Sequence, residues 1–393
     1  MRDYQPTREA GLAQLEAFAP KAGRAYAAGR NTDPGPEAEG AVSALSPWVR
    51  HRLVLEEEVV RTALSRHAFA ASEKFVQEVY WRAYFKGWLE RRPEVWLRYK
   101  TALADGLNQI EKDGALRADY HAAVAAETGT EGFDDWAREL VETGWLHNHA
   151  RMWFASIWIF TLRLPWALGA DFFLRHLMDG DAASNTLSWR WVGGLHTRGK
   201  TYLARADNIE TFTNGRFRPT GLAPSAPALD EAEHPAALPA PQGDGPPMGN
   251  YLLLITDDDL APETADWPRP AAGSLILSDP ATRSPLGVGE TAAGFVGEAV
   301  ADAAERTGAA AGEGEWGPAI LSAAEAAGVK EVATLWTPVG WTADRLNQAE
   351  QVLRENGVTL RRVLRPYDRA AWPHAHKGFF NLKKQIPKLV STL

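Results

Sequence analysis

The first half of the chain follows a helical pattern of apolar and polar positions. Counted from Asn148, Arg151 and Met152 follow after three and four residues, so an amide, a guanidinium and a thioether share one helical face. The stretch FVQEVYWRAYF repeats this spacing from Glu78 to Phe85. Two helical faces with matching polar and aromatic content indicate one shared cavity.

The pattern changes twice after residue 218. Residues 219–248 are rich in proline and poor in large apolar side chains, which is typical of a semi-extended linker. Residues 249–393 then alternate short β runs such as YLLLITDDD with helical stretches. This alternation predicts a parallel sheet with covering helices. We therefore expect a multi-domain α and α/β protein, with a helical domain at 1–218, the linker, and a Rossmann-like α/β domain at 249–393.

Composition narrows the class of protein. The 393 residues include no cysteine, which excludes disulfides, thiolate zinc sites and cysteine-ligated iron–sulfur clusters. No apolar run reaches the length of a membrane span, and the N-terminus lacks an apolar signal core. We expect a cytoplasmic protein with neither a membrane nor a metal as partner.

Charge is unevenly distributed. The net charge is −8, but residues 1–220 hold 28 basic and 28 acidic side chains, so the deficit comes from the remainder. A neutral, arginine-rich first part leaves room for a local basic surface, on which nucleic-acid affinity depends more than on total charge.

One segment carries the candidate chemistry. Residues 143–191 combine arginines, aspartates, asparagines and tryptophans with a largely apolar background. Charges inside an apolar region must be paired or must hold a polar ligand. Indoles in series add stacking surface and one-electron donors. The segment indicates a site for a large aromatic cofactor.

Several separated motifs of the chain resemble those of the photolyase/cryptochrome flavoproteins, in the same order. TGWLHNHARM resembles the family's TGxMHNRxRM, DGDAASN its DGDxAxN, SWRW its WQW, QEVYWR its NELxWRE, VSALSP its TSxLSP and RAYAAGR its YxxxR. The likeness covers roughly residues 4–217. Two positions depart from the pattern: Val42 replaces a threonine of the phosphate-binding element, and His149 replaces an arginine.

The resemblance implies a helical domain that binds FAD. Ser43 and Ser46 before Pro47 fit a phosphate-binding helix start, and Asn185 would face flavin N5, where an amide favours the reduced, protonated flavin. Arg151, paired with Asp179, would lie over the flavin ring. The cofactor-binding residues implied by the motifs are Tyr26, Ser43, Leu45, Ser46, Arg82, Arg151, Asp179, Gly180, Asp181 and Asn185.

The resemblance also implies a substrate pocket and an electron path. A flipped cyclobutane pyrimidine dimer would be held by Glu78, Trp81, Asn148, Met152 and Trp191, with Arg30 and His149 as DNA contacts. Trp189 and Trp166 match the first two members of a tryptophan relay. Its third member stays open among Trp153, Trp158 and Trp96.

The resulting expectation is a deoxyribodipyrimidine photo-lyase, in which FADH− donates an electron to a dimer in single- or double-stranded DNA under blue light. A light sensor of the cryptochrome kind, which binds FAD without repair, is the alternative. His147 and His149 also keep the (6-4) repair branch open. In photolyases the α/β domain precedes the flavin domain, whereas here it follows, so we expect a circular permutation.

Overall fold

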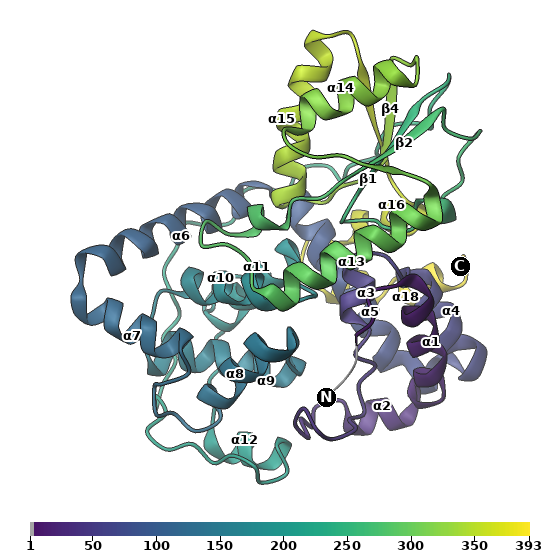
Figure 1. The fold of residues 1–393 in the computed structure, drawn as a ribbon. Helices are drawn as coiled ribbons and strands as arrows, with labels where there is room; N and C mark the ends of the chain where they lie inside the picture. The colour runs from purple at the N-terminus through teal and green to yellow at the C-terminus, as the bar shows by residue number, and fades with distance from the viewer. Residues whose placement is uncertain (1–3) are drawn as a thin grey trace.

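The computed structural model describes residues 4–393, and its first part is built from helices (Figure 1). The long central helix is α5, Phe69–Glu90, which is buried along most of its length. The other helices of this part are α1 Arg8–Phe18, η1 Ala19–Lys21, α2 Arg24–Gly29, α3 Ser46–Arg50, α4 Glu56–Arg66, α6 Glu94–Lys112, α7 Gly114–Val124, α8 Phe133–Thr143, α9 Asn148–Ser156, η2 Ile157–Thr161, α10 Trp166–His176, α11 Ala182–Val192 and α12 Ala206–Phe212.

Aromatic side chains form the core of the helical part. Trp136, Trp153, Trp158 and Trp189 are each at most 2% exposed. Large indoles bury much apolar area, so they hold the helices around α5 together. None of the helices in the described range is long and apolar enough to cross a membrane.

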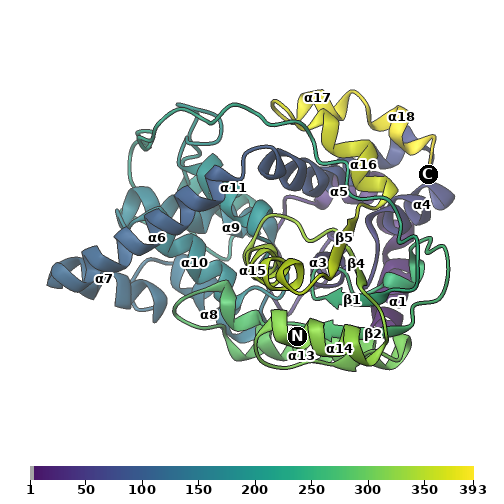
Figure 2. The same cartoon turned by 90° about the horizontal axis from the view of Figure 1, so that it is seen from above.

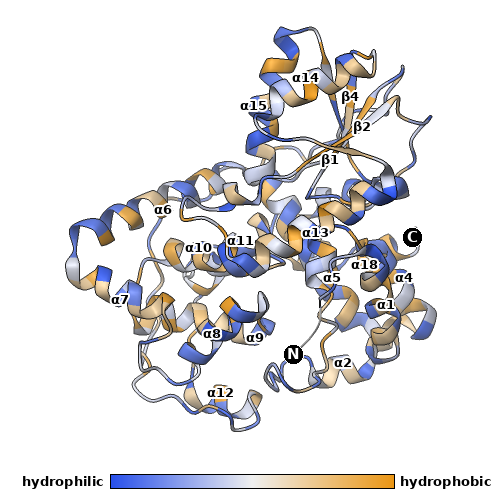
Figure 3. Cartoon of the chain, in the orientation of Figure 1, coloured by the Kyte–Doolittle hydropathy of each residue, from blue (hydrophilic) through white to orange (hydrophobic). Residues whose placement is uncertain are grey.

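The second part contains a five-stranded parallel sheet. Its strands are β1 Leu252–Thr256, β2 Gly273–Leu277, β3 Ala310–Ala311, β4 Glu331–Leu335 and β5 Thr359–Val363, in the order β3-β2-β1-β4-β5. The predicted parallel sheet with covering helices is confirmed. The two-residue strand β3 was not predicted, because it has no apolar run. The strands labelled in Figure 3, β1, β2 and β4, are coloured as largely hydrophobic, as expected for the middle of a sheet covered on both faces.

Alternate residues of the strands pack on opposite faces of the sheet. Leu253 and Ile255 join a core with α13, Glu290–Thr307, and with helices α1 to α4. Leu252 and Leu254 join a separate core with α14, Trp316–Ala326, and α15, Trp341–Glu355. One face therefore lies toward the helical part of the chain, and the other is closed by its own helices.

The linker and the end of the chain tie the two parts together. Residues 219–248 run across the outside without regular helices, and Glu231 forms a bidentate ion pair with Arg190 at 2.6 and 2.5 Å (Figure 2). After β5, the short elements α16 Pro366–Ala371, η5 Trp372–His374, α17 Phe380–Lys383 and α18 Ile386–Val390 return to α5 and α4. Residues 364–393 fell within the predicted α/β unit, but their apolar side chains pack in the helical core.

Candidate functional site

The turn between α10 and α11 carries the aspartates of the DGD motif. Asp179 accepts hydrogen bonds from both terminal nitrogens of Arg151, at 3.0 and 2.8 Å, and Arg151 also donates to the carbonyl of Leu146. Asp179 is 4% exposed in its side chain. A bidentate pair of this kind fixes both planes, so the predicted pairing of α9 with the DGD turn is confirmed.

Asp181 lies at the centre of a second charged cluster. Its side chain caps α11 by accepting from the N–H of Ser184, and it lies 3.3 Å from Arg82 and 3.8 Å from Lys86 of α5. Burial alone would raise the pKa of the Asp181 carboxyl, but the charges of Arg82, Lys86 and Arg50 outweigh burial and hold the pKa below its usual range. Asp181 is therefore a buried carboxylate that stays ionised.

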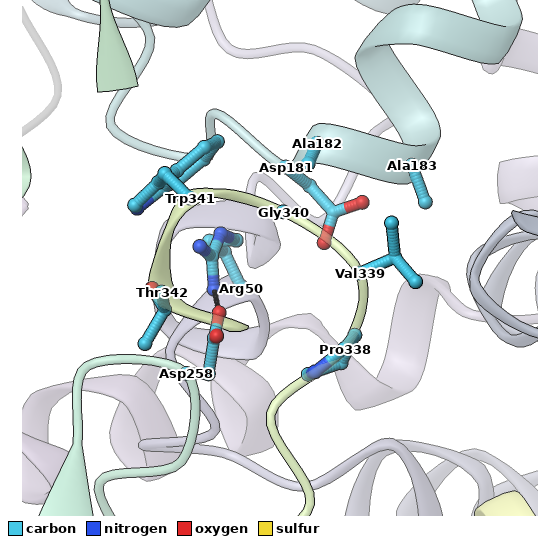
Figure 4. A pocket seen from close by; sticks show the side chains of 10 residues that line it. All are labelled: Arg50, Asp181, Ala182, Ala183, Asp258, Pro338, Val339, Gly340, Trp341 and Thr342. Atoms are coloured by element: carbon cyan, nitrogen blue, oxygen red, sulfur yellow. Dashed lines mark hydrogen bonds and ion pairs between the residues drawn. The ribbon is translucent and has the colours of Figure 1, made fainter. Parts of the chain in front are cut away.

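Two members of this cluster were not predicted from the sequence. Arg50, at the end of α3, donates to the carbonyl of Gly180 at 2.8 Å and to Asp258 at 2.5 Å. Figure 4 shows Arg50 between Asp258 and Trp341, with Asp181 nearby. The run Asp257 to Asp259 directly follows β1, so acidic residues at the carboxyl end of a parallel strand were the available signal.

The predicted phosphate-binding element lies at the start of α3. Ser46 is its first residue, and its hydroxyl accepts a hydrogen bond from the indole of Trp145 at 3.3 Å. The carbonyl of Ser43 accepts from Gln14, and Ala44 has a φ of 54°, a left-handed turn that brings the chain into the helix. Leu45 is buried beneath this turn.

Tyr26, a predicted cofactor-binding residue, lies near Glu78 and Arg30, which are predicted to contact the substrate and DNA. Its ring is 7% exposed and packs edge-on against Phe75 of α5. Burial raises the pKa of the Tyr26 hydroxyl, the carboxylate of Glu78 raises it further, and Arg30 opposes the shift. Tyr26 thus stays protonated and lies within electrostatic reach of two residues predicted to face DNA.

Asn185 and Trp189 occupy one buried side of α11. The Nδ2 of Asn185 donates to the carbonyl of Ala170 at 2.8 Å, which fixes the amide and directs its acceptor oxygen away from α10. Trp189 packs edge-on against Phe173 and Trp158. A Cβ at Gly169 would lie 2.4 Å from the Trp189 ring, so only glycine admits this close packing.

The predicted substrate residues on α5 are accessible. Glu78 is exposed, and its carboxylate lies 3.9 Å from Arg30 of the α2 end. Trp81 is partly buried and stacks on Phe379 with ring centroids 3.8 Å apart. No local pattern of residues indicates that the end of the chain reaches Trp81.

The remaining substrate residues lie on α9 and α11, which contact each other. Asn148 begins α9 and is exposed, Met152 is partly buried, and Trp191 stacks on Tyr202 at 5.8 Å. These three side chains are therefore placed on the accessible side of helices whose buried side carries Trp153 and Trp189.

The two histidines near Asn148 are engaged within the chain. His147 caps α9 by accepting from the N–H of His149. His149 has the carbonyl of Asn31 at 2.9 Å from one ring nitrogen and the hydroxyl of Tyr202 at 3.2 Å from the other. Burial lowers the pKa of His149, so the ring is neutral and both nitrogens have partners. A DNA contact by His149 stays a prediction without a positive charge to support it.

Trp166 leads to a different set of aromatics from Trp189. Its ring lies 5.9 Å from Tyr99, which stacks on Trp96 at 5.0 Å. Among the open candidates for a third relay member, Trp158 contacts Trp189 and Trp153 stacks on His149. Only Trp96 continues from Trp166 within the described contacts.

The carboxyl ends of β1 and β4 form the point where the strand order reverses, the usual place for a ligand in such sheets. Here Arg50 and the DGD turn occupy it together with Trp341, and the remaining space is about 10 Å³, enough for about one water molecule. This edge of the sheet supports the helical site through Arg50 and Asp258.

Comparison with known proteins gives a family for the helical part. Residues 75–218 match the model described as the FAD binding domain of DNA photolyase. A deoxyribodipyrimidine photo-lyase of Streptomyces griseus is 32% identical over 185 residues, which are 43% of this chain and 38% of the relative. One of Thermus thermophilus is 34% identical over 191 residues, 49% of this chain and 43% of the relative. The chain thus spans about two fifths of the length of these relatives.

Two solved structures are also similar. A bacterial class III photolyase from Agrobacterium tumefaciens has a TM-score of 0.44 and 26% identity, covering 53% of this chain and 43% of that one. A cryptochrome of Synechocystis has a TM-score of 0.43 and 22% identity, with the same coverages.

The residues present fit FAD, the cofactor that the family model assigns to this domain. Arg82 Nε and Lys86 Nζ are buried without a hydrogen-bond partner in the described residues, and both suit a pyrophosphate. The paired Arg151 and the fixed amide of Asn185 suit the flavin ring. Residues 75–218 are thus an FAD-binding domain of the DNA photolyase type.

Proposed function

We propose that the protein is a light-driven repair enzyme for cyclobutane pyrimidine dimers in DNA, a deoxyribodipyrimidine photo-lyase. The observation that carries the proposal is that α5 holds both a predicted cofactor-binding residue and predicted substrate-binding residues. Arg82 lies against Asp181, while Trp81 and Glu78, one and four residues before it on the same helix, remain accessible. A bound dimer would therefore lie next to the flavin.

The chain's own residues would hold and orient the cofactor. Ser43, Ser46 and Tyr26 would bind the phosphates and ribityl chain, with Arg82 as the cation. Arg151, fixed by Asp179, would lie against the isoalloxazine, and the acceptor oxygen of Asn185 would accept a hydrogen bond from the flavin N5–H. When bound and reduced, FAD supplies light absorption and a one-electron donor.

The substrate residues would recognise the dimer by shape and hydrogen bonding. Trp81 and Trp191 offer apolar faces, Met152 fills the space between α9 and α11, and Glu78 and Asn148 offer polar groups to the pyrimidine edge. A dimer is poorly stacked in DNA, so its extrusion costs only a few kcal/mol. Arg30 beside Glu78 would meet a neighbouring phosphate.

Photoreduction would use the aromatic side chains of α10, α11 and α6. We assign Trp189 and Trp166 to the first two positions, and Tyr99 and Trp96 to the continuation. Trp96 donates from its indole to Asp344 at 3.0 Å and lies beside the exposed Lys100. The Asp344 carboxylate at the indole N–H favours the oxidised indole electrostatically, and the Lys100 ammonium, which pairs with Asp344 at 2.9 Å, opposes this effect.

The α/β part completes the proposal. Its strand order and its docking against the helical part support a circular permutation of the usual domain order, with the proline-rich linker running outside. In this arrangement Asp258 acts on the flavin site through Arg50 and the carbonyl of Gly180.

The test is illuminated repair of an oligonucleotide that contains one thymine dimer, with the flavin reduced chemically beforehand. Repair that needs light and reduced FAD supports the proposal. Stoichiometric FAD together with no repair of this substrate, single- or double-stranded, would favour the light-sensor alternative. A folded protein that cannot be loaded with FAD contradicts both.

A further inference from the structure

The end of the chain is basic in an otherwise acidic protein. Residues 369–393 contain five cationic side chains, Arg369, Lys377, Lys383, Lys384 and Lys388, and no acidic one, whereas the whole chain has a net charge of −8. Lys377, Lys384 and Lys388 are exposed, and none of these three forms an ion pair within residues 4–393. Free, clustered ammonium groups on a chain of opposite net charge favour a polyanionic partner.

This segment is docked at a defined place. Phe379 is 5% exposed and stacks on Trp81 at 3.8 Å with an interplanar angle of 13°. Arg92 donates to the carbonyl of His376 at 2.9 Å, and Arg61 donates to that of Leu393 at 3.0 Å. The segment is therefore held by the residues just after α5 and by α4, and its helix α17, Phe380–Lys383, contacts α5, which carries Glu78 and Trp81.

An aromatic side chain faces solvent in the same segment. Phe380 is 74% exposed, directly after the buried Phe379. An exposed phenyl ring between lysines can stack on a nucleobase without breaking a contact inside the protein. Such stacking does not depend on which base is present. Phe379 therefore lies against Trp81, and the next residue, Phe380, faces solvent.

We propose that residues 377–388 form a second nucleic-acid contact, which binds the phosphate backbone and one unpaired base of a single DNA strand beside the Trp81 pocket. The position of the contact rests on the proposed function, because it assumes that the damaged strand enters at Trp81. Its chemistry rests on the charges and on Phe380 alone. The lysines supply affinity and Phe380 supplies a stacking platform, and neither reads the lesion.

The test compares two triple charge reversals. One carries Lys377→Glu, Lys384→Glu and Lys388→Glu. The matched control carries Lys112→Glu, Arg117→Glu and Lys330→Glu, which change the net charge equally at exposed positions of α6, α7 and the turn before β4. Dissociation constants are measured for fluorescent single-stranded oligothymidine, undamaged and with one thymine dimer, at several salt concentrations.

We expect the tail variant to bind both oligonucleotides at least tenfold more weakly near 0.1 M salt, and the slope of log K against log salt to fall by about 2. The control should change by less than threefold. Phe380→Ala should weaken binding severalfold with an unchanged salt slope. Equal losses in both charge variants, or an unchanged affinity and slope in the tail variant, would overturn the proposal. Tail-dependent binding to phosphatidylserine vesicles, with unchanged DNA affinity, would overturn it in favour of a membrane surface.

The two proposals fail separately. If the parent binds DNA through the tail but repairs no dimer, the contact stands and the repair proposal fails. If the parent repairs dimers and the tail variant binds as the parent does, the repair proposal stands and the contact fails. Normal circular dichroism and flavin content of each variant confirm that the fold is intact.

Discussion

Arg151 and Asp179 illustrate how a pair of residues positions a buried polar turn. Two hydrogen bonds join the side chains, and Arg151 also reaches the carbonyl of Leu146. The guanidinium donates hydrogen bonds to a carboxylate and to a backbone oxygen. It thereby connects α9 with the loop before it and with the DGD turn. The removal of either partner leaves the other charge buried and unpaired, which costs more than the pair contributes.

Replacing Arg151 with alanine should therefore release FAD and destabilise the fold by about 3 kcal/mol. Flavin absorbance per protein and urea unfolding measure the two effects. Arg205→Ala is the matched control, because Arg205 pairs with Asp207 at an exposed site where such pairs contribute about 0 to 1 kcal/mol. Full flavin content in Arg151→Ala would remove this residue from the cofactor site.

At the scale of elements, α5 carries one residue proposed to bind the cofactor, Arg82, next to one proposed to bind the substrate, Trp81. Arg82 points to Asp181 and Glu56, whereas Trp81 points to Phe379. Successive residues on a helix are about 100° apart, so consecutive side chains necessarily face different surroundings. This geometry lets one helix contact cofactor and substrate.

Substitutions at these neighbours should separate the two functions. Trp81→Ala and Glu78→Gln should lower repair by tenfold or more and leave flavin content near that of the parent. Arg82→Ala should instead lose flavin, because it removes the guanidinium proposed to bind the cofactor's phosphates and one of the cations that face Asp181 and Glu56. Flavin content and repair are measured on the same preparations, and parent-like repair by Trp81→Ala would refute the pocket assignment.

The aromatic side chains of α6, α10 and α11 make a second prediction at this scale. Trp96→Phe and Trp189→Phe keep most of the volume but raise the cost of ring oxidation, so both should slow photoreduction of oxidised flavin severalfold. Trp153→Phe, which removes a ring stacked on His149 and Trp136, should leave that rate unchanged. Repair by chemically reduced protein should be equal in all three. A tryptophan radical yield in Trp96→Phe equal to the parent's would exclude the path through α6.

At the scale of the whole molecule, what the sequence could predict followed from local pattern and motif order. Helical spacing and the DGD and HNHARM motifs gave the helical part and the pairing of Arg151 with Asp179. The contacts of Arg50 with Asp258 and of Phe379 with Trp81 join residues 208 and 298 positions apart. No local periodicity encodes such contacts, because they depend on how the sheet and the end of the chain dock.

The docking of the two parts also makes stability depend on pH through Glu90. This residue ends α5 and accepts a hydrogen bond at 2.6 Å from the N–H of Val339, in the loop after β4. Burial raises the pKa of Glu90 to about 7 from its ordinary value of 4.5, and the Val339 hydrogen bond opposes the shift. The folded state then holds the proton more tightly than the unfolded state. The contribution to stability is therefore fully present below about pH 4.5 and is lost as the pH rises toward 7.

Glu90→Gln keeps an acceptor for Val339 and removes the titration. The melting temperature of the parent should fall relative to that of Glu90→Gln by a few degrees between about pH 5 and pH 8, since about 1 kcal/mol shifts Tm by about 2–4 °C in chains of roughly 150–250 residues and by less in a longer chain. The difference between the two proteins is the readout, because burial also raises the pKa of Asp171 and Asp257, each to about 6, and these groups remain in both. Glu94→Gln, at an exposed position on α6, is the control and should follow the parent. Parallel melting curves of the parent and Glu90→Gln across this range would show that Glu90 is ionised in the folded protein and that its contact with Val339 does not sense pH.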